Sequence, residues 1–262
     1  MSPMPAETDR VRDLAVPAVL SPAAVDAFDA SLDRLVAGSP DEVVLSCNLD
    51  YITSSHIGLM WQASRACADA GIRLRLGSPS AGLLRVLHTL DLCQFFAIGA
   101  DDPDDSAVAP RSASADRGDD TVVYEHVFHA SAESVDCAIK RFVGFLEALG
   151  LPESLRFELR TVFYEVAYNI YLHSGLAPDA DISVRGDAAP HGLRLTFSDA
   201  GVPFDPTRAH TVSTFIDVAR DRQKRGLGLP MLGKLTDRMT YTRTDQGRNV
   251  LSLDKTWGDS SD

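Results

Sequence analysis

The chain has 262 residues, of which 45% are hydrophobic and 24% are charged, and its formal net charge is −12 at pH 7. This length is sufficient for two domains of ordinary size, each with its own apolar core. The negative charge argues against binding to nucleic acid or to an acidic membrane surface, because both require a basic face on the protein. It is compatible with a basic patch on a protein partner.

The four cysteines show neither CxxC nor Cys/His spacing, which is typical of buried thiols in a reducing compartment rather than of a metal site. The chain opens without a basic and then apolar leader. No apolar run approaches the ~20 residues that a transmembrane helix needs. We therefore expect a cytoplasmic protein.

Strand and helix patterns alternate through residues 1–100. The first helix begins at Pro22, directly after the capping residue Ser21, and its apolar residues recur at helical spacing. Further helices are expected at 54–70 and 80–89, and short apolar strands at 14–20, 43–49, 72–76 and 95–98. Such an alternation predicts an α/β domain, with right-handed crossovers and a sheet covered by helices.

Residues 101–120 are acidic, small and almost without large apolar side chains. Such a segment cannot bury enough surface to offset the entropy of ordering it. The sequence therefore predicts a flexible linker at 101–120, between a first domain at 1–100 and a second domain at 121–258.

The second domain begins with a predicted strand and two predicted helices, followed by strand patterns. The helices are expected at 132–149, 155–173 and 229–237, and the strands at 122–129, 182–185, 193–198, 239–244 and 249–255. Because most helices precede most strands, we expect one mixed sheet with the helices layered on one face.

The helix at 155–173 carries three polar residues on one stripe. Glu165, Asn169 and His173 are spaced four residues apart, beside the apolar stripe of the same helix. A glutamate beside a terminal phosphate can accept the proton of an incoming hydroxyl, and an asparagine oxygen suits Mg²⁺. The stripe thus suits a phosphoryl-transfer site, although, taken alone, such a stripe is more often the solvated face of an amphipathic helix.

Asp199 ends the predicted strand at 193–198, and Gly201 allows a sharp turn after it. A carboxylate at this position can accept a hydrogen bond from an exocyclic amino group such as that of adenine. Taken alone, an Asp-x-Gly sequence is more often simply a turn.

Gly226 and Gly228, with Leu227 between them, precede the predicted helix at 229–237. Backbone amides at a helix N-terminus bind phosphates, and the cations Lys224 and Arg225 lie just before them. A Gly-x-Gly pair is weak on its own, but it gains weight from the two polar motifs upstream.

The order and spacing of these motifs resemble the Bergerat-fold ATPases, a superfamily that includes histidine kinases, type II topoisomerase subunits and Hsp90-type chaperones. Within it, the second domain is most similar to the anti-sigma-factor serine-protein kinases, which share the segments 198–206 and 245–255. The resemblance covers about 121–257. It implies an α/β two-layer sandwich that binds ATP and Mg²⁺.

The resemblance also implies roles for individual residues. Glu165 becomes the catalytic base, Asn169 the magnesium ligand and Asp199 the adenine anchor. A mobile lid would span 205–225, with Lys224 or Arg225 approaching the terminal phosphate. The remaining residues expected around the nucleotide are His173, Gly201, Gly226, Leu227 and Gly228.

The first domain resembles the STAS domain, the fold of anti-sigma-factor antagonists, over about 14–98. In that family the cognate kinase phosphorylates a serine at the start of a helix, which here maps to Ser54, with Ser55 beside it. Thr53 replaces the aspartate usual in the family, and His56 replaces a glycine. The alternative role for Ser54 is a helix N-cap, worth ~1 kcal/mol.

These resemblances imply an ATP- and Mg²⁺-dependent serine-protein kinase in a partner-switching pathway, fused to its antagonist-like domain. That domain would be a cis substrate, an inhibitor or a docking scaffold. The implied partners are a sigma factor, a separate STAS antagonist, a phosphatase or a second copy of the chain. One alternative is a nucleotide-dependent switch that transfers no phosphate. Another is a sensor-kinase fragment, although nothing upstream of 121 offers the dimerising helices and phosphoacceptor histidine of a histidine kinase.

Overall fold

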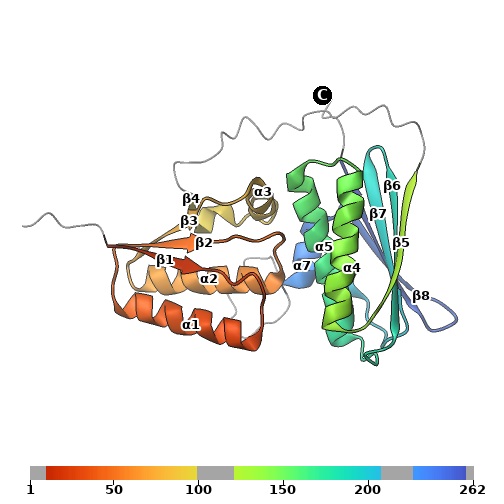
Figure 1. Cartoon of the computed structure of the whole chain (residues 1–262), viewed down its shortest axis with the longest axis horizontal. Coiled ribbons are helices and arrows are strands. Elements are labelled where there is room, and N and C mark those ends of the chain that lie inside the picture. The colour runs from red at the N-terminus through yellow and green to blue at the C-terminus, as the bar shows by residue number, and fades with distance from the viewer. Residues whose placement is uncertain (1–9, 99–120, 208–226, 258–262) are drawn as a thin grey trace, which may run out of the picture. The chain divides into compact units, whose positions relative to one another are not determined.

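The computed structural model describes residues 10–98, 121–207 and 227–257. The chain divides into two compact units, residues 1–107 and 108–262, drawn in Figure 1. The predicted linker at 101–120 lies outside the described residues, as does most of the predicted lid. None of the helices in the described ranges is long and apolar enough to cross a bilayer.

The N-terminal unit is built on a four-stranded sheet in the order β1-β2-β3-β4, and all three strand pairs are parallel. Its strands are β1 (Val11–Ala15), β2 (Glu42–Ser46), β3 (Arg73–Gly77) and β4 (Ala97–Ile98). The connecting helices are α1 (Pro22–Ala37), α2 (Ser54–Asp69) and α3 (Ala81–Thr89), and the short 3₁₀ helix η1 (Cys93–Phe95) precedes β4. The predicted α/β character of this unit is confirmed.

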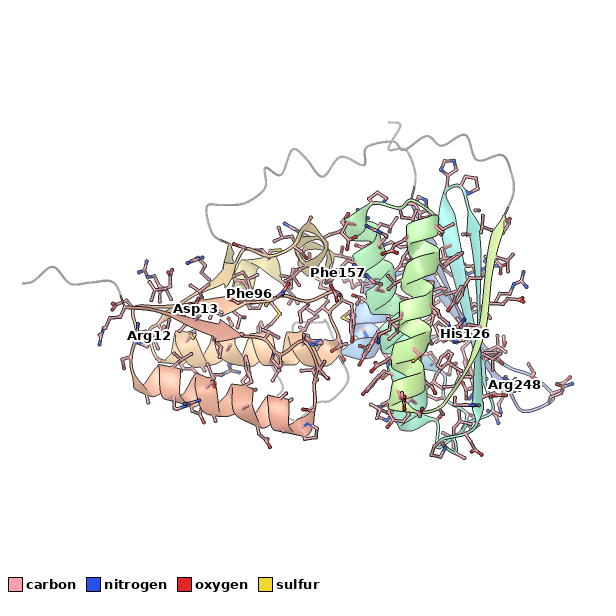
Figure 2. The ribbon with its side chains drawn as sticks, in the orientation of Figure 1. Arg12, Asp13, Phe96, His126, Phe157 and Arg248 are labelled. Carbon is pink, nitrogen blue, oxygen red and sulfur yellow. The ribbon has the colours of Figure 1, made fainter. Side chains whose placement is uncertain are left out.

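The predicted strand at 14–20 is wrong in its position. Strand β1 begins earlier and contains two charged residues, Arg12 and Asp13, labelled in Figure 2. The last ladder hydrogen bond runs from the amide of Val16 to the carbonyl of Ser46, at 2.9 Å. Pro17 follows and has no N–H to donate, so the pairing cannot continue.

The C-terminal unit contains a five-stranded sheet in the order β5-β6-β7-β9-β8. Its strands are β5 (Val122–His129), β6 (Asp181–Ala189), β7 (Gly192–Asp199), β8 (Arg238–Arg243) and β9 (Asn249–Thr256). Every pair among these strands is antiparallel, so the expected mixed sheet is wrong. The hairpins β6-β7 and β8-β9 join edge to edge through β7 and β9, which run in opposite directions.

Two long helices, α4 (Ala132–Ala148) and α5 (Glu153–His173), pack on one face of this sheet (Figure 1). Helix α7 (Gly228–Leu235) contacts α5. Between helices and sheet, the ring of Phe163 stacks on Phe142 with centroids 4.5 Å apart and meets Phe197 edge-on at 5.2 Å. This aromatic core fixes α5 against the middle of the sheet, since each such pair adds about 0.5–1.5 kcal/mol beyond its buried area.

The apolar stripe predicted on α5 is buried. Leu155, Leu159, Val162 and Val166 are each no more than 3% exposed, whereas Ile170, the last residue of the predicted stripe, is half-buried. The adjoining polar stripe therefore has a fixed direction, which decides where Glu165 and Asn169 lie.

Candidate functional site

Helix α5 places Glu165 and Asn169 one turn apart. Glu165 is 6% exposed, whereas Asn169 is half-buried. The amide Nδ2 of Asn169 donates a long hydrogen bond of 3.5 Å to Oε1 of Glu165. With its nitrogen turned toward the carboxylate, the asparagine directs its oxygen Oδ1 to the other side.

Gly228, the first residue of α7, lies directly against this pair. A Cβ atom added at Gly228 would lie 1.9 Å from Oε1 of Glu165 and 3.4 Å from Nδ2 of Asn169. No other residue type fits at this position without displacing the glutamate. The structure thus brings together three residues predicted for one site, from segments about sixty positions apart in the sequence.

Asp199 ends β7 and is 5% exposed. Its oxygen Oδ1 accepts two hydrogen bonds, from the amide of Gly201 at 2.8 Å and from Nδ2 of Asn249 at 2.9 Å. Both fall on the same oxygen, and within the described ranges no hydrogen bond falls on Oδ2. The second oxygen is therefore the acceptor that this carboxylate retains for a ligand.

Gly201 connects the Asp199 turn to the end of α5. A Cβ at Gly201 would lie 2.5 Å from both the Cβ and the carbonyl oxygen of Ser174, the residue that caps the C-terminus of α5. The amide of Val202 donates to that carbonyl at 2.8 Å. This glycine is required by close approach to a helix end, and it couples Asp199 to the helix that carries Glu165.

Sequence reasoning gave no site role to Asn249, the first residue of β9. It pairs with Asp199 in the β7–β9 ladder. Its Oδ1 accepts hydrogen bonds from the hydroxyl of Tyr241 at 2.8 Å and from Nη1 of Arg243 at 2.6 Å. The antiparallel pairing of the two predicted strands at 193–198 and 249–255 is the signal that would have placed these residues together.

A second glutamate on α5 lies two turns before Glu165 and has a cation beside it. Glu158 is 1% exposed, and its Oε2 lies 3.2 Å from Nζ of Lys255, a side chain only 12% exposed. This buried ion pair joins α5 to β9. It is a contact of the fold, whereas Glu165 faces a glycine.

The start of α2, where Ser54 was mapped, has a different construction. Thr53, not Ser54, is the N-cap, so the N-cap role considered for Ser54 is wrong. The amide of Thr53 donates to Nδ1 of His56 at 3.1 Å, and the Thr53 hydroxyl accepts from the His56 amide at 3.3 Å. This capping box explains why Thr53 is the N-cap. His56, at the third position of the helix, pairs with the residue three positions before it.

The imidazole of His56 is 2% exposed and neutral. Because Nδ1 accepts from the Thr53 amide, the proton lies on Nε2, which is 3.2 Å from the carbonyl of Pro17 and donates to it. Burial lowers the pKa of His56 to about 4, despite the hydrogen bonds to backbone carbonyls, which raise it. Beside it, Ser54 is half-buried and Ser55 is exposed.

The remaining predicted residues separate into two groups. His173 is the last residue of α5 and is exposed, and Leu227 lies just before α7 with 9% of its surface exposed. Lys224, Arg225 and Gly226 lie outside the described residues. The roles of all these residues at a nucleotide stay predictions.

The side chains near Asn169 determine how a magnesium ion could be coordinated. Across 10–98, 121–207 and 227–257, no group of three or more His, Cys, Asp or Glu side chains is arranged to hold a metal ion. An ion at Asn169 would thus share its coordination with phosphate oxygens and water, as Mg²⁺ commonly does in phosphoryl-transfer sites. The orientation of Asn169 fits that arrangement.

Comparison with known proteins addresses the C-terminal unit. Residues 128–255 match the family described as the histidine kinase-like ATPase domain. Among solved structures, the chain is similar to one chain of the SiaB-SiaC complex from Pseudomonas aeruginosa, with 13% identity, a TM-score of 0.38, and coverage of 53% of this chain and 91% of that chain. No curated protein matches the chain. The C-terminal unit of this protein is therefore a histidine kinase-like ATPase domain, and the resemblance to ATP-binding folds is confirmed at that level.

Proposed function

We propose that the C-terminal unit is a serine-protein kinase of the anti-sigma type, which binds ATP with Mg²⁺ and phosphorylates a partner protein. The observation that carries the proposal is the convergence of Glu165, Asn169 and Gly228. A domain that only binds nucleotide has no need of a buried glutamate held against the glycine of a phosphate-binding motif. A kinase needs such a base.

In the proposed reaction, Glu165 takes the proton of a serine hydroxyl as that oxygen attacks the γ-phosphorus. The new oxygen–phosphorus bond forms while the bond between the γ-phosphorus and the bridging oxygen breaks, and ADP leaves with that oxygen. Asn169 would hold Mg²⁺, which neutralises charge on the phosphates when bound. Asp199 would hold the base, and the amides around Gly228 would face the phosphates.

The partner would be a sigma factor or a separate STAS antagonist, and phosphorylation would decide which protein is bound. The N-terminal unit is the second component of this proposal. Fusion raises the effective concentration of two linked domains to about the millimolar range. The unit would thus act as a substrate in cis, an inhibitor or a docking scaffold. A phosphatase or a second copy of the chain would complete the pathway.

The direct test is incubation of the full chain with γ-³²P-labelled ATP and Mg²⁺, with and without purified STAS proteins. Glu165→Gln should keep ATP affinity, measured by calorimetry, but lose about 10²–10⁴-fold in label transfer. The matched control is Glu133→Gln, because Glu133 is an exposed glutamate of α4. Equal ATP binding by wild type and Glu165→Gln, with no label transferred by either, would refute the kinase.

One observation, at the start of α2, favours either a substrate in trans or the competing function, a nucleotide-dependent switch that transfers no phosphate. Thr53 and His56 hydrogen-bond to each other at the start of α2. Ser54→Ala and Ser55→Ala variants separate the cases, because a cis substrate loses its label in one of them. A sensor-kinase fragment would instead yield acid-labile phosphohistidine.

A further inference from the structure

We propose that Asn249 is the positioning residue of the nucleotide site, because its amide holds Asp199 so that only an acceptor is presented to the base. The inference deepens the proposed function and rests on nucleotide binding at Asp199. It concerns base selectivity, which the proposed kinase chemistry leaves open.

The orientation of the Asn249 amide is determined by its neighbours. Nη1 of Arg243 and the hydroxyl of Tyr241 both lie within 2.8 Å of one amide atom, and a guanidinium can only donate. That atom must therefore be the oxygen Oδ1. The nitrogen Nδ2 faces acceptors alone: the Asp199 carboxylate at 2.9 Å and the carbonyls of Val202 at 3.0 Å and Gly201 at 3.4 Å.

The same network uses the donors that surround Asp199. The two hydrogens of Nδ2 on Asn249 are shared among three acceptors, and the amide of Gly201 bonds to Oδ1 of Asp199. Nη1 of Arg243 also donates to the carbonyl of Gly201, at 3.2 Å. A ligand approaching Asp199 thus meets the acceptor Oδ2, and these donors are already engaged.

An acceptor with no adjacent donor selects a base by its exocyclic amino group. The 6-amino group of adenine can donate to Oδ2, whereas the 6-carbonyl of hypoxanthine or guanine would place two acceptors against each other. In this arrangement Arg243 and Tyr241 orient Asn249, Asn249 orients Asp199, and Asp199 contacts the ligand. Asn249 is 6% exposed, so it acts through the carboxylate.

The experiment measures two dissociation constants on each full-length variant, for ATP and for inosine triphosphate, both with Mg²⁺. Inosine triphosphate differs from ATP chiefly in bearing a carbonyl in place of the 6-amino group. Wild type should prefer ATP by at least about tenfold, since a hydrogen bond to a charged group is worth a factor of about ten or more. Asn249→Ala should reduce that preference about tenfold, mainly by weakening ATP.

The ratio of the two constants separates positioning from folding, because a loss of folded protein weakens both nucleotides alike. Ser252→Ala is the matched control: Ser252 lies on the same strand and shares a side-chain hydrogen bond of 3.1 Å with Thr196, away from Asp199. It should keep the wild-type ratio. Tyr241→Phe removes one hydroxyl and keeps the ring, and it should lower the ratio by less than Asn249→Ala.

The outcomes are distinct. If wild type prefers ATP and the ratio is unchanged in both Asn249→Ala and Tyr241→Phe, the positioning role is refuted while ATP binding stands. If wild type binds both nucleotides equally, Asp199 does not select the base. The inference then fails, while the proposed kinase function stands. If wild type binds neither nucleotide, the proposed function fails, and this inference fails with it.

Discussion

The start of α2 and the end of β7 both carry polar residues that a family resemblance predicts to be functional, and their construction differs. At α2, Thr53 and His56 hydrogen-bond to each other, and the imidazole reaches back to Pro17. At β7, the two hydrogen bonds to Asp199 both fall on one oxygen and leave the other for a ligand.

The difference shows how to distinguish structural from functional polar residues. A polar cluster that satisfies its own donors and acceptors stabilises the fold, and it has little left to offer a ligand. A buried carboxylate with one oxygen in reserve, as at Asp199, costs stability that the fold alone does not repay. By this criterion the departures at Thr53 and His56 are structural features of α2.

The largest effect on nucleotide affinity that sharpens this comparison is expected for Gly228→Ala. The new methyl group would lie 1.9 Å from Oε1 of Glu165, so either the glutamate or α7 must move. We expect the affinity for ATP, measured by calorimetry, to fall by at least about a hundredfold, or about 3 kcal/mol.

Gly144→Ala is the control for that substitution. A Cβ at Gly144, an exposed glycine of α4, meets nothing within 4 Å. Alanine there should keep ATP affinity and stabilise the helix by about 0.5–1 kcal/mol. Wild-type affinity in Gly228→Ala would mean that the contact with Glu165 is not part of the nucleotide site.

Lys255→Met tests what the buried ion pair of Glu158 and Lys255 is worth in the C-terminal unit. It leaves the buried carboxylate of Glu158 without its cation, and we expect a loss of about 3–5 kcal/mol in the free energy of unfolding. Urea denaturation, followed by the fluorescence of Trp257 in a Trp61→Phe background, measures it.

The double variant Glu158→Gln/Lys255→Met should recover most of that stability, because it removes both charges together. The affinity for ATP is then compared between the double variant and wild type. If the pair belongs to the fold alone, the folded double variant binds ATP as wild type does. A large loss of affinity in the folded double variant would contradict the structural interpretation of Glu158.

The buried His56 predicts a pH effect on the N-terminal unit. Its pKa is lowered to about 4, whereas an unfolded histidine titrates near 6.5, so between these values the unfolded chain binds the additional proton. The stability is therefore complete above about pH 6.5 and is lost as pH falls toward 4, by about 3 kcal/mol at most.

Thermal unfolding at several pH values measures this loss, with Trp61 as the only tryptophan in a Trp257→Phe background. His56→Gln should flatten the dependence between pH 6.5 and 4. His88→Gln changes an exposed histidine of α3 and should keep the wild-type profile. An unchanged profile in His56→Gln would show that other groups govern the acid sensitivity.

The smallest effect concerns the cap of α2. Thr53→Ala removes the hydroxyl that accepts from the His56 amide, and it should cost about 1 kcal/mol in unfolding free energy. Ser55→Ala, at an exposed position, should change it by less than about 0.5 kcal/mol. Equal costs at the two positions would argue against Thr53 as the N-cap.

The sequence predicted most helices and strands to within a few residues, and the edge strand β1 is the main exception. The strand at 122–129 is correct to the residue. Helix α5 begins two residues before its predicted start, at Glu153, directly after its N-cap residue Pro152. Apolar spacing identifies such elements through many repeated positions. The edge strand β1 was misplaced because its charged residues hide the apolar pattern, whereas the apolar residues after Leu14 imitate one.

The candidate site was predictable where it depends on one helix. The spacing of Glu165 and Asn169 fixes their stripe, and the position of Asp199 follows from the end of its strand. The contact between Asp199 and Asn249 joins residues fifty positions apart and depends on which strands are neighbours. The choice of Thr53 over Ser54 as N-cap depends on the His56 side chain, since threonine and serine are both good caps.

The contact of Gly201 with Ser174 has a consequence for how nucleotides of different length would be told apart. Because the turn after Asp199 is packed on the end of α5, a movement of Asp199 relative to Glu165 would have to disturb the contact between Gly201 and Ser174. If Asp199 holds the base, a triphosphate would reach farther toward Glu165 than a monophosphate would. The number of phosphates would then decide whether the end of the chain comes close to Glu165.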